Sequence, residues 1–324
     1  MKQLVIGIDL GGTKISTALA DDSGKIIAHD YRETRAEEGQ EVVVGRMLDA
    51  ARQVMAQAEV ETAQVSAVGI GAPGPLDIEA GVVVDPPNLP GWNRVPLKQL
   101  IETELAITTF LDNDANAAAL GEHRFGAGRG TEHMIYVTAS TGIGGGLILD
   151  GKLYHGVGGF AGEVGHITIL PNGPLCNCGN RGCLESLASG TAIAREARER
   201  VAHGTPTLMA DLSEGDPKRI TAKLVAEAAN RGDAEAQHIL SVAMNHLGIG
   251  IASLVNLFNP QLVVIGGGLT NVGDPLFGPV RRAIDRHAFA TTAQGVRVAR
   301  AELGANAGVM GAVAVALAHL DTAN

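Results

Sequence analysis

The sequence predicts an α/β protein built from two domains of similar architecture. At 324 residues the chain is longer than one hydrophobic core usually serves, so two domains are expected. The order strand, glycine-rich turn, strand occurs twice, near residue 11 and again near residue 142. Helical spacing of apolar residues follows later in each half. We therefore expect a first domain over residues 1–115, a second over 116–305, and a terminal apolar helix, 306–324, that packs back on the first.

The first domain is predicted to begin with three strands joined by turns, followed by a helix and further strands. Apolar runs bounded by glycine, proline and asparagine indicate the strands, and apolar residues at helical spacing indicate the helix. The predicted elements are strands at 3–9, 15–21 and 25–31, a helix at 42–60, a strand and glycine-proline loop at 65–74, a proline-broken loop at 85–97, a strand at 108–114 and a helix from 115.

The second domain repeats the opening order and then becomes mainly helical. Residues 134–156 read as strand, glycine turn, strand, turn and strand. Pro260 ends a long apolar helix, because proline cannot continue one. The remaining predicted elements are helices from about 189, at 221–231 and at 233–258, a parallel-type strand at 261–269 and the terminal helix.

Composition and charge exclude several functional classes. Apolar residues make up 45% of the chain and charged residues 19%, as in a soluble globular protein. The formal net charge of −10 argues against a nucleic-acid partner, which requires a basic face. The amino-terminal apolar run is interrupted by Asp9 and has no cleavage site, so it predicts a buried strand and not a signal peptide. The longest apolar window, around 247–258, is shorter than a membrane span, and we expect a cytoplasmic protein with no membrane partner.

Glycine clusters mark two turns and one strand end where backbone can approach a ligand. Gly11 and Gly12 lie at the first turn, where exposed N–H groups can cradle phosphate while Thr13 adds a hydroxyl and Lys14 a cation. The spacing is not that of a Walker motif, and taken alone the turn also fits an ordinary hairpin.

The second turn, over residues 140–146, occupies the matching place in the second domain. Its cradle residues are Thr141, Gly142 and Gly144. Gly267 and Gly268 follow a buried strand and precede an expected helix, where a nucleotide base or ribose can lie close to the backbone. Together the three clusters predict a nucleotide site formed by both domains.

Asp114 is the candidate general base. It follows a strand and opens a helix, where aspartate is also a common N-cap. We expect Asp112 and Asp114 to point to opposite faces if the strand persists, so only one of the two carboxylates is expected in the site. The helix start holds Asp114 rigidly, and the neighbouring Asn113 can bind a second hydroxyl.

All three cysteines of the chain lie within eight residues, at Cys176, Cys178 and Cys183, with His166 ten residues upstream. Three thiolates and one imidazole suit tetrahedral zinc. The alternative is three unrelated buried cysteines. A catalytic zinc keeps an open position for water, so four protein ligands predict a structural site, and no HExxH pair suggests a zinc hydrolase.

The motifs together resemble the ROK family (repressors, uncharacterised open reading frames, sugar kinases), most closely its bacterial glucokinase branch. They are, in order, DLGGTK, LDNDANAAALGE, STGIGGG, GEVGH with CNCGNRGCLES, and VVIGGGL. The resemblance covers nearly the whole chain. It implies the actin-like ATPase fold, in which two ribonuclease-H-like domains surround a central cleft, and it implies ATP, Mg²⁺ and structural Zn²⁺ as cofactors.

The resemblance also implies roles for particular residues. Asp114 matches the family's base for the sugar 6-hydroxyl, and Asp9 lies near Mg²⁺. The residues that match sugar contacts are Asn88, Asn113, Asp114, Glu163, His166 and Glu185. The residues that match zinc ligands are His166, Cys176, Cys178 and Cys183.

The implied activity is ATP-dependent phosphorylation of glucose, giving glucose 6-phosphate and ADP for glycolysis, by a homodimer or homotetramer. The loops GAPGPLD and PPNLPGW favour glucose, although mannose, N-acetylglucosamine, N-acetylmannosamine and fructose remain open as acceptors and polyphosphate as donor. The other alternative is a non-catalytic, sugar-sensing ROK regulator. Such proteins carry a DNA-binding segment before the first turn, whereas here the first strand is expected within the first five residues and the chain is acidic.

Overall fold

The computed structural model describes residues 3–323, and the chain divides into two compact units. Unit 1 comprises Met1–Glu132, Gly146–Gly162 and Ala301–Asn324, and unit 2 comprises His133–Gly145 and Glu163–Arg300. This division differs from the expected one at residue 115, because the helix after that position packs within unit 1.

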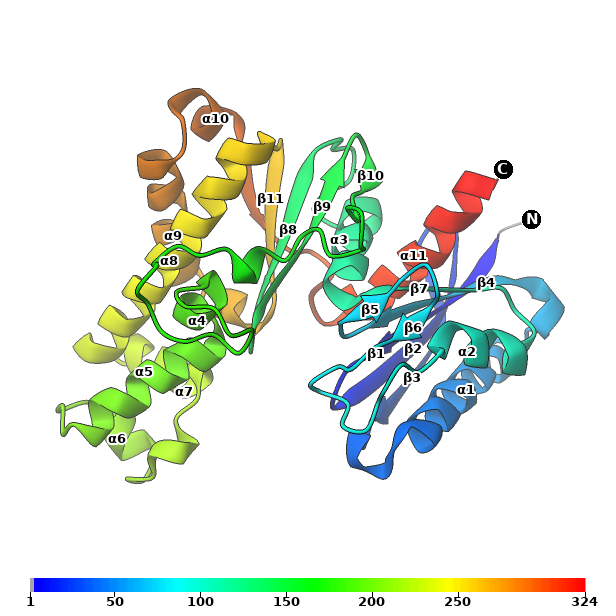
Figure 1. The fold of residues 1–324 in the computed structure, drawn as a ribbon, viewed down its shortest axis with the longest axis horizontal. Coiled ribbons are helices and arrows are strands. Elements are labelled where there is room, and N and C mark those ends of the chain that lie inside the picture. The colour runs from blue at the N-terminus through cyan, green and yellow to red at the C-terminus, as the bar shows by residue number, and fades with distance from the viewer. Residues whose placement is uncertain (1–2, 324) are drawn as a thin grey trace. The chain divides into compact units, whose positions relative to one another are not determined.

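Unit 1 contains a five-stranded sheet with the order β3-β2-β1-β4-β7 (Figure 1). The first three strands pair antiparallel, and β4 and β7 continue the sheet in parallel. The bounds are β1 Leu4–Leu10, β2 Lys14–Asp21, β3 Ile26–Glu33, β4 Val65–Ala72, β7 Thr109–Asn113, and a separate hairpin of β5 Leu76–Asp77 and β6 Val82–Val83. The helices are α1 Gln40–Gln57, α2 Leu97–Leu105, α3 Asp114–Phe125 and α11 Ala307–Ala323.

Helices cover both faces of this sheet. Successive side chains of β1 point to opposite faces and nearly all are buried, so each face must pack against other elements. Ile6, Ile8 and Leu10 enter a core with α1 and α2, whereas Val5 lies in a second core with α11. Gly69 of β4 lies on the α11 face, where an added Cβ would come within 2.0 Å of a helix carbonyl oxygen, that of Ala312. Glycine at this position therefore permits the helix to lie directly on the sheet.

The second five-stranded sheet repeats the topology of the first, with the order β10-β9-β8-β11-β12. β11 pairs in parallel with β8 and β12, and β10 pairs antiparallel with β9. The bounds are β8 Met134–Ala139, β9 Ile143–Leu149, β10 Lys152–Leu153, β11 Leu262–Gly266 and β12 Arg297–Arg300. The helices of unit 2 are α4 Leu184–Ala188, α5 Gly190–Ala202, α6 Leu208–Leu212, α7 Ala222–Asn230, α8 Ala234–Phe258, α9 Asp274–His287 and α10 Ala290–Gly295.

Helix α8 is the central helix of unit 2 and packs against α4, α5, α7 and α9. Among the described residues it is the one helix long and apolar enough to cross a membrane, with a mean hydropathy of 1.5. In the structure 61% of that apolar window is buried, which identifies α8 as a core helix. The apolar segment is thus longer than the window expected from the sequence.

Several elements differ from the sequence-based prediction for local reasons. The helix expected after Gly268 is present as α9, but its bounds were not predicted, because Pro275 at its start and Pro279 inside it weaken the helical signal. Strand β12 is a short, largely exposed edge strand without a continuous apolar run. The third strand of the second hairpin is only Lys152–Leu153, because the chain then enters a glycine-rich loop.

Candidate functional site

The candidate base lies where β7 ends and α3 begins, a segment over residues 112–116 that we call the base junction. Asn113 is the N-cap of α3, and its Oδ1 accepts hydrogen bonds from the N–H groups of Ala115 at 2.9 Å and Asn116 at 3.4 Å. Asp114 is the first helical residue and is exposed. Its Oδ1 accepts from the Ala115 N–H at 2.7 Å. The cap is therefore Asn113, and Asp114 presents a carboxylate at a helix N-terminus, where negative charge is favoured.

Asp112, in contrast, is a buried carboxylate with a full set of partners. The residue as a whole is 1% exposed, and its Oδ1 accepts from Asn113 N at 2.8 Å and from Asn116 Nδ2 at 3.1 Å. Its Oδ2 lies 2.7 Å from His155 Nε2. The hydrogen bond to Asp112 raises the pKa of His155, although burial acts in the opposite direction. The sequence did not predict this pair, although a buried carboxylate needs hydrogen-bond donors or a positive charge beside it.

The first glycine turn uses part of its own hydrogen-bonding capacity internally. Gly11 N–H donates to Lys14 O at 2.8 Å, and Gly11 O accepts from Thr34 Oγ1 at 2.6 Å. Gly11 therefore shapes the turn, and the residues left to meet a phosphate are Gly12, Thr13 and Lys14. A Cβ on Gly12 would lie 2.9 Å from Asn88 Cβ, so the turn packs directly against the loop that carries this predicted sugar contact.

Asp9 is the penultimate residue of β1 and lies on the face covered by α11. A Cβ on Gly308, near the start of α11, would lie 2.3 Å from Asp9 Oδ2, so only glycine leaves room for the carboxylate there. Burial raises the pKa of Asp9, and the charge of Lys14 partly offsets this effect. A bound cation would favour the ionised carboxylate in the same way.

The second glycine turn is held by the segment that follows the last cysteine. Ile143 N–H donates to Glu185 Oε2 at 3.0 Å, and Gly190 N–H donates to Ser140 O at 2.7 Å. Thr141 O accepts from Thr191 Oγ1 at 2.9 Å. Helices α4 and α5 thus fix the backbone of this turn on both sides of Thr141 and Gly142.

The third glycine cluster lies against the second turn, within unit 2. A Cβ on Gly267 would come within 2.4 Å of Ala139 O, and Gly267 has a φ of +84°. A Cβ on Gly268 would lie 3.7 Å from Ser140 Oγ. The structure therefore brings together two of the three predicted nucleotide-binding clusters, within unit 2.

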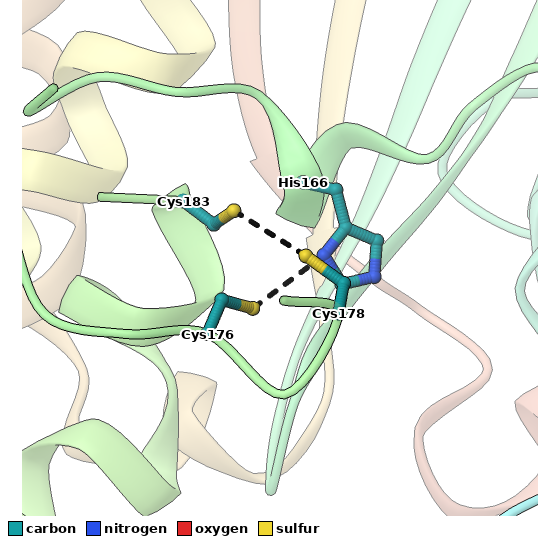
Figure 2. Close-up of side chains that lie close together, drawn as sticks. All are labelled: His166, Cys176, Cys178 and Cys183. Carbon is teal, nitrogen blue, oxygen red and sulfur yellow. Dashed lines mark hydrogen bonds between the residues drawn. The ribbon is translucent and has the colours of Figure 1, made fainter. Parts of the chain in front are cut away.

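Four side chains of unit 2 form what we call the sulfur cluster: His166, Cys176, Cys178 and Cys183 (Figure 2). Their ligand atoms all lie within 4.8 Å of one another. The Sγ atoms of Cys178 and Cys183 are 3.7 Å apart, as are Cys176 Sγ and His166 Nδ1. Tetrahedral zinc with Zn–S bonds of about 2.3 Å requires sulfur atoms about 3.8 Å apart. The cluster thus has the spacing and donor set for zinc.

Burial makes the sulfur cluster unfavourable for free thiolates. Desolvation raises the pKa of Cys183 to about 12 and also raises that of Cys176. The pKa of exposed Cys178 is lowered, chiefly by a backbone hydrogen bond from Asn180. A divalent cation would supply the positive charge that buried thiolates require.

Three predicted sugar contacts belong to the sulfur cluster or lie beside it: His166 is a member, and Glu163 and Glu185 are close to it. His166 lies in a 3₁₀ turn, Val164–His166, with Nδ1 toward Cys176 and Nε2 at 3.8 Å from Glu163 Oε2. Glu185 Oε1 is 4.0 Å from Cys176 Sγ, while its other oxygen accepts from the second glycine turn. Glu185 therefore connects the sulfur cluster to the second glycine turn, a link that the sequence did not reveal.

Comparison with known proteins places these features in a family. The ROK family model matches residues 5–319. A glucokinase of Thermotoga maritima is 40% identical over 314 residues, 97% of each chain. The crystal structure of a ROK family glucokinase from Streptomyces griseus in complex with glucose and AMPPNP has a TM-score of 0.82 and 36% identity, covering 97% of this chain and 99% of that one. A putative xylose repressor of a Caldicellulosiruptor species is 35% identical over 98% of this chain and 79% of its own length.

Proposed function

This chain belongs to the ROK family and is an ATP-dependent sugar kinase with the actin-like ATPase fold, and on that premise we propose that its acceptor is glucose. The products are glucose 6-phosphate and ADP. The observation that carries this proposal is the similarity over almost the full chain to a glucokinase structure that holds glucose and AMPPNP.

Asp114 is the proposed general base. Asp114 is exposed, and its carboxylate accepts a hydrogen bond from Ala115 N–H at the start of α3. It accepts the proton of the 6-hydroxyl while the hydroxyl oxygen bonds to the γ-phosphorus and ADP leaves. A positioned base of this kind contributes about 10²- to 10⁴-fold to the rate.

The glycine turns are proposed to hold ATP. Backbone N–H groups of Gly12 and Gly142 and the Lys14 ammonium counter negative charge on the phosphates. The same role is proposed for Thr13, Thr141 and Gly144. Gly267 and Gly268 are proposed to lie beside the nucleotide base or the ribose of ATP. Mg²⁺ would offset charge on the transferring phosphoryl group, and a single carboxylate such as Asp9 suits it because Mg²⁺ takes its other ligands from phosphates and water.

The sulfur cluster is proposed to be a structural zinc site that shapes a sugar clamp. Four protein ligands leave no open position for water, so zinc stabilises a loop and does not react. His166 ligates through Nδ1 and keeps Nε2 for a sugar hydroxyl. Glu163 precedes that turn and Glu185 follows Cys183, so the fixed loop carries a sugar contact at each end. Asn88 and Asn113 are the proposed contacts from unit 1.

The acceptor is tested by initial rates of ADP formation with a panel of hexoses and N-acetylhexosamines. We expect the highest kcat/KM with glucose and glucose 6-phosphate as the product. A highest value with mannose, N-acetylglucosamine, N-acetylmannosamine or fructose would change the acceptor and leave the kinase assignment intact. The same assay with polyphosphate in place of ATP tests the donor.

A sugar-sensing regulator is the second candidate, and the similarity to a putative xylose repressor favours it. Sugar binding without ADP formation on any sugar of the panel would support this reading. We further propose a cytoplasmic homodimer or homotetramer, which cell fractionation and light scattering would test.

A further inference from the structure

We infer that His155 is a positioning residue for Asp114, acting through the buried carboxylate of Asp112. The inference rests on the proposed role of Asp114 as the base. It concerns contacts within unit 1 alone, because residues 146–162 belong to that unit.

Asp112 contacts residues on both sides of Asp114. Its Oδ1 accepts from the main-chain N–H of Asn113, which precedes Asp114, and from the side-chain amide of Asn116, two residues after it. Asn116 is itself 2% exposed. One carboxylate oxygen thus connects the N-cap of α3 to a buried side chain in its first turn, so a rotation of this carboxylate would disturb the start of α3.

His155 holds the other oxygen of that carboxylate. Its Nε2 lies 2.7 Å from Asp112 Oδ2, and the Asp112 side chain is 2% exposed. Asp112 is the group that raises the pKa of His155, through the hydrogen bond and through its charge. Without the imidazole, Oδ2 would be buried without this donor, and the carboxylate would have to rotate or take up a proton.

The main chain keeps His155 in place. Tyr154 N–H donates to Leu147 O at 2.8 Å, which ties the residue before His155 to β9. His155 O accepts from Ala161 N–H at 3.0 Å, which closes the loop between them. The imidazole therefore connects an anchored loop to the base junction, 43 residues earlier in the chain.

The test compares H155L, which removes the donor, with H155Q, whose side-chain amide can still donate to Asp112. Trp92 is the single tryptophan and lies on the loop that carries Asn88, so its fluorescence reports glucose affinity without turnover. We expect H155L to lower kcat about 10- to 100-fold, the effect of a misplaced catalytic group, with glucose affinity within about threefold of wild type. We expect H155Q to keep most of the wild-type kcat.

Three outcomes would overturn the inference: an H155L variant with wild-type kcat, equal losses in H155L and H155Q, or a loss of kcat matched by an equal loss of glucose affinity. If H155L does not fold, H155N replaces it, because its shorter amide cannot reach Asp112. Asp114→Asn is measured alongside. Normal turnover in D114N would contradict both the assignment of Asp114 as the base and this inference. Loss of turnover in D114N together with full activity in H155L would contradict only the inference about His155.

Discussion

The base junction in unit 1 and the sulfur cluster in unit 2 bury polar groups in different ways. At the base junction, the Asp112 carboxylate is buried with donors from Asn113, Asn116 and His155. In the sulfur cluster, the thiols of exposed Cys178 and buried Cys183 lie at the spacing of metal ligands, and burial raises the pKa of Cys183 to about 12. The first site is stabilised by the protein alone, whereas the second requires a cation to hold thiolates. We therefore expect a metal chelator to leave the structure of the base junction unchanged. The same treatment should disorder the sulfur cluster and the proposed sugar contacts beside it.

The largest expected effect is that of removing the proposed base. Asp114→Asn keeps the size of the side chain and its acceptor oxygen toward Ala115 N–H, so the helix start should persist. Because the amide cannot accept the hydroxyl proton, we expect kcat to fall about 10²- to 10⁴-fold. Glucose affinity from Trp92 fluorescence should stay within a few-fold, and stopped-flow or coupled assays of ADP formation measure the rate. A variant with near wild-type turnover would remove Asp114 from the role.

A smaller effect is expected at the second glycine turn. Thr191→Val removes the hydroxyl that donates to Thr141 O at 2.9 Å. Loss of one such hydrogen bond corresponds to about 1 kcal/mol, so KM for ATP should rise about fivefold. Thr191→Ser keeps the hydroxyl and is the matched control. A rise in KM for glucose with no change in KM for ATP would contradict this prediction. It would show that the hydrogen bond from Thr191 to Thr141 affects sugar binding and not ATP binding at the second glycine turn.

The smallest effect concerns stability and pH at the base junction. The pKa of His155 is raised in the folded state, so its contribution to stability is fully present below the unfolded pKa near 6.5 and is lost as the pH rises through the folded pKa. Urea unfolding of wild type and His155→Gln should therefore differ more at pH 6 than at pH 9. Because His155 is partly exposed, we expect this change to be no more than about 1 kcal/mol. A difference that grows with pH would contradict the assigned direction.

The sequence predicted the parts of the fold and site that depend on local pattern. Repeated hairpins around Gly11 and Gly142 indicated two similar α/β sheets, and the ROK motifs correctly indicated the family and the actin-like ATPase fold. The spacing of the cysteines predicted a metal-binding group, and the side chains converge as expected. These features arise from residues that are close in the chain or in a fixed periodicity.

The sequence could not predict contacts that depend on long-range packing. The expectation that strand alternation separates Asp112 from Asp114 is wrong, because residues i and i+2 of a strand share a face. The two carboxylates differ because β7 ends at Asn113 and Asp114 begins α3. Nothing in the sequence indicated that His155 would be the partner of Asp112. The internal bonds of Gly11 and the link from Glu185 to the second turn likewise require the folded arrangement. The bounds of helix α9 could not be predicted either, because its two prolines weaken the local helical signal and tertiary packing outweighs that propensity.

The contrast between the two sites is tested most directly by removing metal from the wild-type protein. Zinc content is measured before and after chelation, together with glucose affinity, thermal unfolding and kcat at saturating glucose. We expect chelation to release zinc, weaken glucose binding and lower the unfolding temperature, and zinc addition to restore all three. Asn177→Ser, an exposed change between two ligands, should behave as wild type, whereas Cys183→Ser should resemble the chelated protein. A zinc-free protein with unchanged glucose affinity and stability would contradict the account.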